Sequence, residues 1–403
     1  MSNGRSTRHS SYDVVIVGGA MLGSSVAWFL ADNPDFDGRI LVVERDPTYA
    51  LCSTAHTNSC MRQQFSNEIN IRISQFAAEY VKNFRDHMGG DMRIPRVVMQ
   101  NFGYMYLAGS VEAAENLRAS QRLQASLGAG TRFMSPGEIA AAYPFYRLDD
   151  IIGGNHNLVD EGYFDGNTLF DWWRRRAREA GVEFLKGEVV AMTLVPGGSR
   201  VASLRLASGE EVQCGWLVNA SGPRAARVAR MAGIELPVEP RKRYTFVFAA
   251  EKPLAGELPL TVDPSGVHVR SDGACYMAGC PPVDDRAVDY DDFVEDHTLW
   301  QEKAWPAIAW RIPAFEAVKL VNSWVGHYAY NVLDQNAIVG PHDEVENFLF
   351  VNGFSGHGLQ QSPAMGRGIA EWISYGGYRS LDLAPLGFGR VRAGRPLPEQ
   401  AVI

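Results

Sequence analysis

The sequence predicts a mixed α/β fold in which a part with parallel strands is joined to an antiparallel sheet. A β-branched run, a glycine turn and a helical pattern follow one another at 12–31, and the same order returns at 348–375. The stretch 244–328 predicts strands instead, separated by Pro-Ser-Gly and Ser-Asp-Gly turns. A chain of 403 residues, 46% of them hydrophobic, is long enough for two or three folding units.

The N-terminal segment predicts one βαβ unit. A strand at 12–17 ends at the glycine turn 18–23, which leads into a helix at 24–31. A second apolar strand at 39–44 follows an Asn-Pro-Asp break and ends on an acid. The order of strand, helix and strand favours parallel pairing of the two strands.

Helices and strands follow one another through the rest of the chain. Apolar residues at helical spacing, together with Gly and Pro at the segment ends, predict most of the helices. The sequence 135–138 has the form of a capping box with Pro at the first helical position, and its short helix must end before Pro144. The other expected elements are helices at 68–87, 111–126, 167–180 and 363–375, and strands at 182–185, 201–218 and 348–352.

Charge and cysteine content exclude several classes of protein. The chain has 38 Lys and Arg against 46 Asp and Glu, a net charge of −8, so no global field attracts nucleic acid. Five cysteines, an odd number, fit reduced thiols better than a disulfide framework. Cys275 and Cys280 lack partner ligands at zinc spacing, so we expect no metal. No apolar run approaches the roughly 20 residues of a membrane span. We therefore expect an intracellular, cytoplasmic protein that has no membrane span.

The first glycine turn, 18–23, has the form that binds a dinucleotide pyrophosphate. Its first Gly permits the tight turn and its last lets the helix pack on the strand, although Ala20 replaces the usual middle Gly. Glu44 ends the next strand where an acceptor for a ribose hydroxyl belongs, and its charge would repel a 2′-phosphate. An ordinary βα turn is the alternative interpretation.

A second glycine turn, at 353–358, distinguishes FAD from NAD. A helix follows this turn as well, so its positive N-terminal end is available to a second part of a long cofactor. A flavin gains from such an end because reduction places negative charge on its ring. A glycine-rich loop that serves only as a turn is the alternative.

These motifs resemble the D-amino-acid-oxidase superfamily of FAD enzymes. The resemblance rests on 17–23, Glu44, 53–65, 219–222 and above all 353–361, and it is nearest to the branch of sarcosine oxidase, glycine oxidase and dimethylglycine dehydrogenase. The chain also resembles mitochondrial FAD-oxidoreductase-domain proteins that assist the assembly of respiratory complex I.

The resemblance implies a Rossmann-like FAD-binding domain of the GR2 type with an inserted antiparallel-sheet substrate domain. The implied FAD-binding segments are 12–90, 150–235 and 325–380, the substrate-binding segments are 91–149 and 236–324, and the tails are 1–11 and 381–403.

The implied cofactor is FAD, bound non-covalently. The segment 53–56 also resembles a histidyl-FAD attachment, so a covalent link through His56 stays open. The implied contacts are Gly18, Gly19, Ala20, Met21, Leu22, Gly23, Glu44, Arg45, Ser53, Thr54, His56, Thr57, Asn58, Ser59, Met61, Val189, Ala220, Ser221, Gly222, Gly353, Ser355, Gly356, His357, Gly358, Leu359 and Gln360.

Four residues are expected at the substrate: Arg62, His327, Tyr328 and Gln360. Arg62 matches an arginine that grips the substrate carboxylate in sarcosine oxidases, and a structural ion pair is the alternative. Gln360 stands where those oxidases have a cationic contact, and Tyr328 lies about where glycine oxidases have an arginine. The carboxylate grip is therefore incomplete or is completed elsewhere.

Other positions bear on the substrate site less directly. The unassigned candidates for completing the carboxylate grip are Arg241, Lys242, Arg243 and Arg270. Met277 falls near a lysine that activates oxygen in sarcosine oxidases, which favours a dehydrogenase or a slow oxidase. Trp324 and Tyr330 belong, with His327 and Tyr328, to an aromatic cluster that is expected to wall a substrate pocket or to pack in the core.

We therefore expect an FAD-dependent oxidoreductase that oxidises the C–N bond of an amino acid or N-substituted glycine by hydride transfer to flavin N5. The imine then hydrolyses, and oxygen or an electron-transfer partner accepts the electrons. Alternatives are a D-amino-acid or 2-hydroxy-acid dehydrogenase on the same fold, and a flavoprotein that binds or assembles another complex.

Overall fold

The computed structural model describes residues 6–401 and builds them around two eight-stranded sheets and one two-stranded sheet. The first sheet has the order β17-β18-β11-β1-β2-β8, with β10 paired to β11 and β9 paired to β10. Its strands are β1 (Ser11–Val17), β2 (Ile40–Glu44), β8 (Glu183–Lys186), β9 (Val189–Leu194), β10 (Val201–Leu206), β11 (Glu211–Asn219), β17 (Ile338–Pro341) and β18 (Phe348–Asn352).

The centre of this sheet is parallel and buried on both faces. β1 pairs in parallel with β2 and β11, and β18 continues this parallel part beyond β11. Val15 and Val17 of β1 belong to one hydrophobic core, whereas Val14 and Ile16 belong to the core on the other face. Burial on both faces explains why the strand is a continuous apolar run rather than an alternating one.

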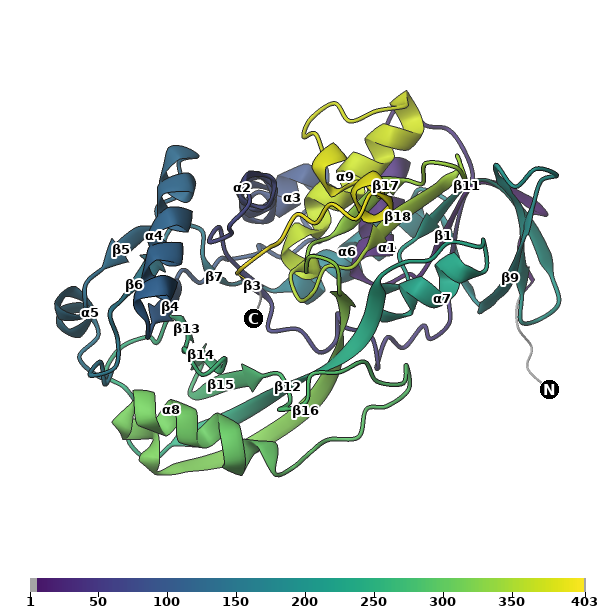
Figure 1. The fold of residues 1–403 in the computed structure, drawn as a ribbon. Helices are drawn as coiled ribbons and strands as arrows, with labels where there is room; N and C mark the ends of the chain where they lie inside the picture. The colour runs from purple at the N-terminus through teal and green to yellow at the C-terminus, as the bar shows by residue number, and fades with distance from the viewer. Residues whose placement is uncertain (1–5, 402–403) are drawn as a thin grey trace.

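Helices cover both faces of the first sheet (Figure 1). Helix α1 packs against α6 and α9, and α9 also contacts α2. The helices near this sheet are α1 (Met21–Ala31), α2 (Glu68–Lys82), α3 (Phe84–His87), α6 (Gly166–Glu179), α7 (Ala225–Arg230) and α9 (Gly358–Tyr375).

The second sheet is mostly antiparallel and packs against a separate hydrophobic core. Its strand order is β16-β12-β15-β14-β13-β4-β6-β5. The strands are β4 (Tyr104–Ala108), β5 (Arg132–Met134), β6 (Gly153–Asn157), β12 (Val238–Ala250), β13 (Leu260–Val262), β14 (His268–Asp272), β15 (Cys275–Cys280) and β16 (Val318–Asn331).

The remaining elements lie around this sheet or close the chain. The two-stranded sheet is β3 (Cys60–Met61) with β7 (Gly162–Tyr163). The helices are α4 (Val111–Ser126), α5 (Pro136–Ala142), α8 (Trp305–Arg311) and α10 (Gly389–Arg392), and the short helical turns are η1 (Gly222–Arg224), η2 (Trp300–Ala304), η3 (Pro313–Glu316) and η4 (Ala384–Leu386).

The predicted fold class is confirmed, because a parallel βαβ unit and a largely antiparallel sheet are both present. The capping box is also confirmed: the Glu138 N–H donates to Ser135 Oγ, and the Ser135 N–H donates to Glu138 Oε2. The helix predicted at 24–31 begins earlier, at Met21, inside the glycine turn.

Two predicted helix bounds were wrong. The helix expected at 68–87 is broken at Asn83 into α2 and α3. The helix expected at 363–375 begins at Gly358, because the end of the glycine motif forms its first turn. Pro363 therefore lies inside α9, where it has no N–H for the carbonyl of Leu359, and that carbonyl accepts from Ser362 Oγ instead.

Two strands and the C-terminal segment bear on the predicted domain bounds. β6, just after residue 149, pairs with β4 in the second sheet, and β16 runs across the predicted bound at 324/325. The segment 381–401, predicted as a tail, forms η4 and α10, and its Leu397 N–H donates to Asp334 in the turn between β16 and β17.

Within residues 6–401 no helix is both long and apolar enough to span a membrane. The same residues contain no group of three or more His, Cys, Asp or Glu side chains placed to hold a metal ion.

Candidate active site

One long cavity extends from the carboxyl ends of β1, β2, β11 and β18 to the second sheet. Ligands of open parallel sheets bind outside the carboxyl ends of the strands. The cavity also reaches residues of β12, β14 and β16, so the two sheets provide opposite parts of its wall.

The β1–α1 turn forms one end of the cavity. Gly18 has φ +98°, and a Cβ there would overlap the carbonyl oxygen of Ala220, so the backbone of β11 approaches the turn too closely for any side chain. Ala20, the N-cap of α1, provides no side-chain hydrogen bond, and Ala20, Met21 and Leu22 line the cavity. The N-terminus of α1 is therefore open to an anionic group.

Glu44 lies beside this turn at the end of β2. Its Oε2 accepts from the Gly19 N–H (2.8 Å) and its Oε1 from the Asp46 N–H (2.8 Å). Burial raises the pKa of the Glu44 carboxyl, and the two N–H groups partly offset this. The carboxylate is thus fixed by backbone groups at the cavity wall, where the sequence predicts the ribose of a dinucleotide.

The β18–α9 turn forms another part of the cavity wall. Gly356 has φ +101°, and a Cβ there would overlap the ring of Tyr328. The N-cap of α9, His357, makes no side-chain capping bond. Burial lowers the pKa of His357 to about 3, so its ring is neutral at physiological pH, and within the described residues its Nε2 has no hydrogen-bond partner. A second open helix N-terminus and a buried polar atom without a partner fit a flavin ring at this end.

The structure brings most of the predicted cofactor residues together around this cavity. Those that line it are Gly18, Ala20, Met21, Leu22, Glu44, Arg45, Ser53, Thr54, His56, Thr57, Asn58, Ser59, Val189, Ala220, Ser221, Gly222, Gly353, Ser355, Gly356, His357, Gly358, Leu359 and Gln360.

Three predicted contacts lie behind the wall instead. Gly19 presents its N–H to Glu44, and Gly23 packs against the carbonyl oxygen of Gly18. Met61 is fully buried in the core that contains Trp28 and Tyr49. These residues shape the wall but do not face the cavity.

His56 faces the cavity and is held on two sides. Its Nδ1 lies 3.0 Å from the Cys52 carbonyl oxygen. Its ring stacks on Phe293 with centroids 6.2 Å apart, and Phe293 stacks in turn on His327 at 4.2 Å.

Arg62 and Gln360, both predicted at the substrate, lie next to each other in the cavity wall. The Arg62 N–H donates to Gln360 Oε1 (2.7 Å). The guanidinium of Arg62 is buried, stacks over Phe65 at 4.3 Å, and donates through Nη2 to the Ala401 carbonyl. Its Nε has no hydrogen-bond partner anywhere in the described chain. A buried cation with a free donor fits an anionic ligand.

Tyr328 and His327 lie next to each other on β16 and both line the cavity. Burial raises the pKa of Tyr328, and the charges of Arg243 and Arg62 partly offset this. His327 Nε2 lies 2.8 Å from the Asp292 carbonyl oxygen, and burial lowers the pKa of His327. Tyr328 therefore stays protonated, and His327 is engaged with the loop that carries Phe293.

The sequence left four cationic residues unassigned. Among the described residues, Arg243 is the only one of these four that lines the cavity. Its guanidinium is paired with Asp285 at 2.7 Å and 3.0 Å. Arg270 is paired with Asp272 (2.8 Å) and also donates to the sulfur of Met277. Outside the cavity wall lie Arg241, Lys242, Arg270, Met277, Trp324 and Tyr330.

Sequence reasoning missed Tyr104, Glu161 and His268. Tyr104 and His268 line the cavity. Glu161 accepts from the Gln63 N–H (2.7 Å) and Gln64 Nε2 (2.9 Å), and burial raises its pKa to about 7. Burial and nearby arginines lower the pKa of His268 to about 3. No sequence motif identifies these residues. They lie near residues 58–64 only because of strand pairing, which leaves no local pattern in the sequence.

Comparisons with known proteins agree with this geometry. The family model of FAD dependent oxidoreductases, DAO, matches residues 13–372. The FAD-dependent oxidoreductase domain-containing protein 1 of Xenopus laevis is 36% identical over 424 residues, which cover 97% of this chain and 85% of that protein. Mitochondrial sarcosine dehydrogenase of Mus musculus is 22% identical over 380 residues, which cover 91% of this chain and 40% of that protein.

Solved structures share the fold. L-Proline dehydrogenase from P. horikoshii matches with a TM-score of 0.83 and 22% identity, covering 96% of this chain and 99% of its own. Glycine oxidase from Geobacillus kaustophilus matches with a TM-score of 0.74 and 20% identity, covering 94% and 98%. The resemblance predicted from the motifs is therefore confirmed, and the chain belongs to the DAO family of FAD-dependent oxidoreductases.

Proposed function

We propose that this FAD-dependent oxidoreductase oxidises the C–N bond of a small amino acid, with an N-substituted glycine as the preferred class. The substrate loses two electrons and two protons as its amine becomes an imine, and water then hydrolyses the imine. The observation that carries the proposal is the state of Arg62. Its guanidinium is buried at the wall of the cofactor cavity, and its Nε has no hydrogen-bond partner among residues 6–401.

The cavity residues fit FAD along its length. The β1–α1 turn would hold the pyrophosphate and Glu44 a ribose hydroxyl, while the β18–α9 turn would face the ring. When bound, FAD supplies the acceptor for two electrons. We propose non-covalent binding, and acid precipitation tests it: a yellow supernatant over white protein is expected, whereas a yellow pellet would indicate a covalent link, with His56 as the candidate.

The protein groups around the substrate bind and orient rather than carry protons. Arg62 would hold the substrate carboxylate, and the buried surroundings would favour the neutral form of its amine. His268 and His357 are both neutral at physiological pH because their pKa values are about 3. No side chain of the site is assigned as an obligatory base.

Reduction of the flavin without air tests the proposed reaction. The panel contains sarcosine, glycine, L-proline, D-amino acids and 2-hydroxyglutarate, each mixed with the holoenzyme under anaerobic conditions. We expect sarcosine or another secondary amino acid to bleach the flavin absorbance fastest. Bleaching by 2-hydroxyglutarate alone would replace the proposal with a hydroxy-acid dehydrogenase, and bleaching by no member would refute amino-acid oxidation.

Gly18→Ala is expected to weaken FAD binding. The new Cβ overlaps the Ala220 carbonyl at a positive φ, and such local strain costs about 1–3 kcal/mol. If the turn opens to relieve the strain, FAD affinity falls roughly 5- to 150-fold. Fluorescence titration of the apoprotein with FAD measures this. Gly256→Ala is the control, because a Cβ there meets no described atom within 4 Å, and equal affinities of the two variants would contradict the prediction.

Glu161 is expected to make stability fall as pH rises from about 4.3 to 7. Its pKa is about 7 in the folded protein and about 4.3 in an unfolded chain, so within this window the folded state holds a proton that the unfolded state has lost. The loss is at most about 4 kcal/mol. Urea unfolding across this range should show a flatter curve for Glu161→Gln, and equal slopes would be inconsistent with a neutral Glu161.

A further inference from the structure

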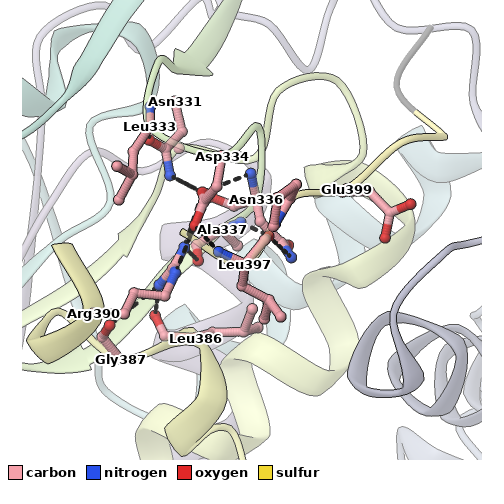
Figure 2. A network of polar contacts seen from close by, with 12 residues as sticks. Asn331, Leu333, Asp334, Asn336, Ala337, Leu386, Gly387, Arg390, Leu397 and Glu399 are labelled. Atoms are coloured by element: carbon pink, nitrogen blue, oxygen red, sulfur yellow. Dashed lines mark hydrogen bonds and ion pairs between the residues drawn. The ribbon is translucent and has the colours of Figure 1, made fainter. Parts of the chain in front are cut away.

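The chain end returns to the site as an ordered strap, defined as residues 396–401. Figure 2 shows its anchor: Asp334 receives the Leu397 N–H (3.0 Å) and the Arg390 Nε (2.8 Å), and the Asp334 carbonyl accepts from the Glu399 N–H (3.0 Å). From this anchor the yellow chain end runs back toward β3, which directly precedes Arg62 (Figure 1). The C-terminal strap and the residues around Arg62 thus meet at the wall of the cavity.

Glu399 fastens the strap to the start of α2. Its side chain is only 2% exposed, so its charge is held by hydrogen bonds rather than by water. Oε1 accepts from the Ser66 N–H (2.8 Å), Ser66 Oγ (2.7 Å) and the Ala401 N–H (3.0 Å). Oε2 accepts from Asn67 Nδ2 (3.1 Å) and Asn70 Nδ2 (2.8 Å). One carboxylate therefore sets both the position of the strap and the direction of the Ala401 peptide.

The Ala401 carbonyl receives Nη2 of Arg62, so the strap fixes the guanidinium from one side. Phe65 supports the face of the guanidinium, and Glu399 adds a favourable charge nearby. Of the guanidinium nitrogens, only Nη2 has a hydrogen-bond partner among the described residues, and Nε is buried without one. Release of the strap would break the five hydrogen bonds of Glu399 together. The strap is therefore a fixed part of the site and not a mobile cover.

We propose that Glu399 is a positioning residue for substrate recognition. It holds the strap so that the Ala401 carbonyl fixes Nη2 and leaves Nε and Nη1 of Arg62 for a substrate carboxylate. This inference rests on the proposed function, because it assigns the group that Arg62 recognises, but the contact between strap and arginine exists independently of any substrate. The substrate class it implies is an amine that carries a carboxylate within reach of the guanidinium.

The test compares wild type, Glu399→Ala and Glu399→Gln as FAD-loaded proteins, with the exposed Glu344→Ala as the matched control in the same region. The first measurement is turnover of sarcosine and of its amide, which lacks the carboxylate. In Glu399→Ala, kcat/KM for sarcosine is expected to fall about 10- to 100-fold through KM, as expected for a misplaced binding group, while the value for the amide changes less than about 2-fold. Glu399→Gln keeps the acceptor Oε1 and is expected to lie between wild type and Glu399→Ala.

The second measurement is independent of turnover. Phenylglyoxal modifies exposed guanidinium groups, and peptide mass spectrometry follows its reaction at Arg62. We expect modification of Arg62 at least about 10-fold faster in Glu399→Ala than in wild type or Glu344→Ala, because the strap no longer covers it.

Equal labelling of Arg62 in all variants would overturn the proposal, as would equal losses for sarcosine and its amide. If no amine reduces the wild-type flavin, the proposed function fails and the labelling result alone decides the role of Glu399. If Glu399→Ala does not fold, Glu399→Gln carries both measurements.

Discussion

Asp334→Ala is expected to lower the free energy of unfolding by about 3–5 kcal/mol, because removing one member of a buried ion pair leaves the other charge without compensation. The Asp334 side chain is completely buried and that of Arg390 is 9% exposed. Alanine would also remove the acceptor of the Asn331 Nδ2 (2.8 Å) and of the Asn336 and Leu397 N–H groups. Figure 2 shows that these donors come from both the β16–β17 turn and the C-terminal segment. The substitution therefore frees two segments at once.

A surface pair from the same region is the control. Asp343 and Arg392 lie 3.1 Å apart, and the Arg392 side chain is 54% exposed. Asp343→Ala is expected to change the free energy of unfolding by less than about 1 kcal/mol. Both variants are unfolded in urea at one fixed FAD concentration, since bound FAD adds its own stabilisation. Similar losses in the two variants would show that the network around Asp334 is not a source of stability.

The parts of the fold that sequence predicts are those with local signals. The apolar run of β1, the glycine turn at Gly18 and the Ser135–Glu138 capping box each occupy a few consecutive residues, so their physical cause is readable without a structure. The start of α9 was missed because Pro363 looks like a first-turn residue. The carbonyl that Pro363 leaves free is satisfied by Ser362, which only the structure shows.

The candidate site divides in the same way. Arg62 and Gln360 carry a family resemblance, and the structure brings them within one hydrogen bond. Glu161 and His268 have no sequence signal, because the pairing of β3 with β7 and of β14 with β15 places them near the site.

The chain end, 381–403, was predicted as a tail because the family resemblance places it outside both domains. Its order depends on Asp334 and on the Glu399 contacts with α2, which are long-range. Pattern reasoning within a short window cannot find such contacts.

Arg62→Met is expected to give the largest loss of activity in the molecule. Truncating one partner of a buried, hydrogen-bonded charge pair costs about 2–5 kcal/mol, which corresponds to a fall in kcat/KM for a carboxylate substrate of roughly 30- to 5,000-fold. Methionine has similar length and packs on Phe65, so the fold should persist. Stopped-flow reduction of the flavin by sarcosine measures the loss, and the absorbance spectrum before mixing confirms that FAD is bound.

Arg243→Met is the control that tests whether this loss is specific to the substrate carboxylate. Arg243 also lines the cavity, but its guanidinium already donates two hydrogen bonds to the Asp285 carboxylate, which neutralises its charge. A paired arginine contributes less to the binding of an incoming anion. The fall in kcat/KM should therefore be smaller than for Arg62→Met, and it should be similar for sarcosine and its amide. If Arg243→Met instead causes the larger, carboxylate-selective loss, the substrate lies on the β12 side of the cavity, and Arg62 serves as a structural cation held by the strap.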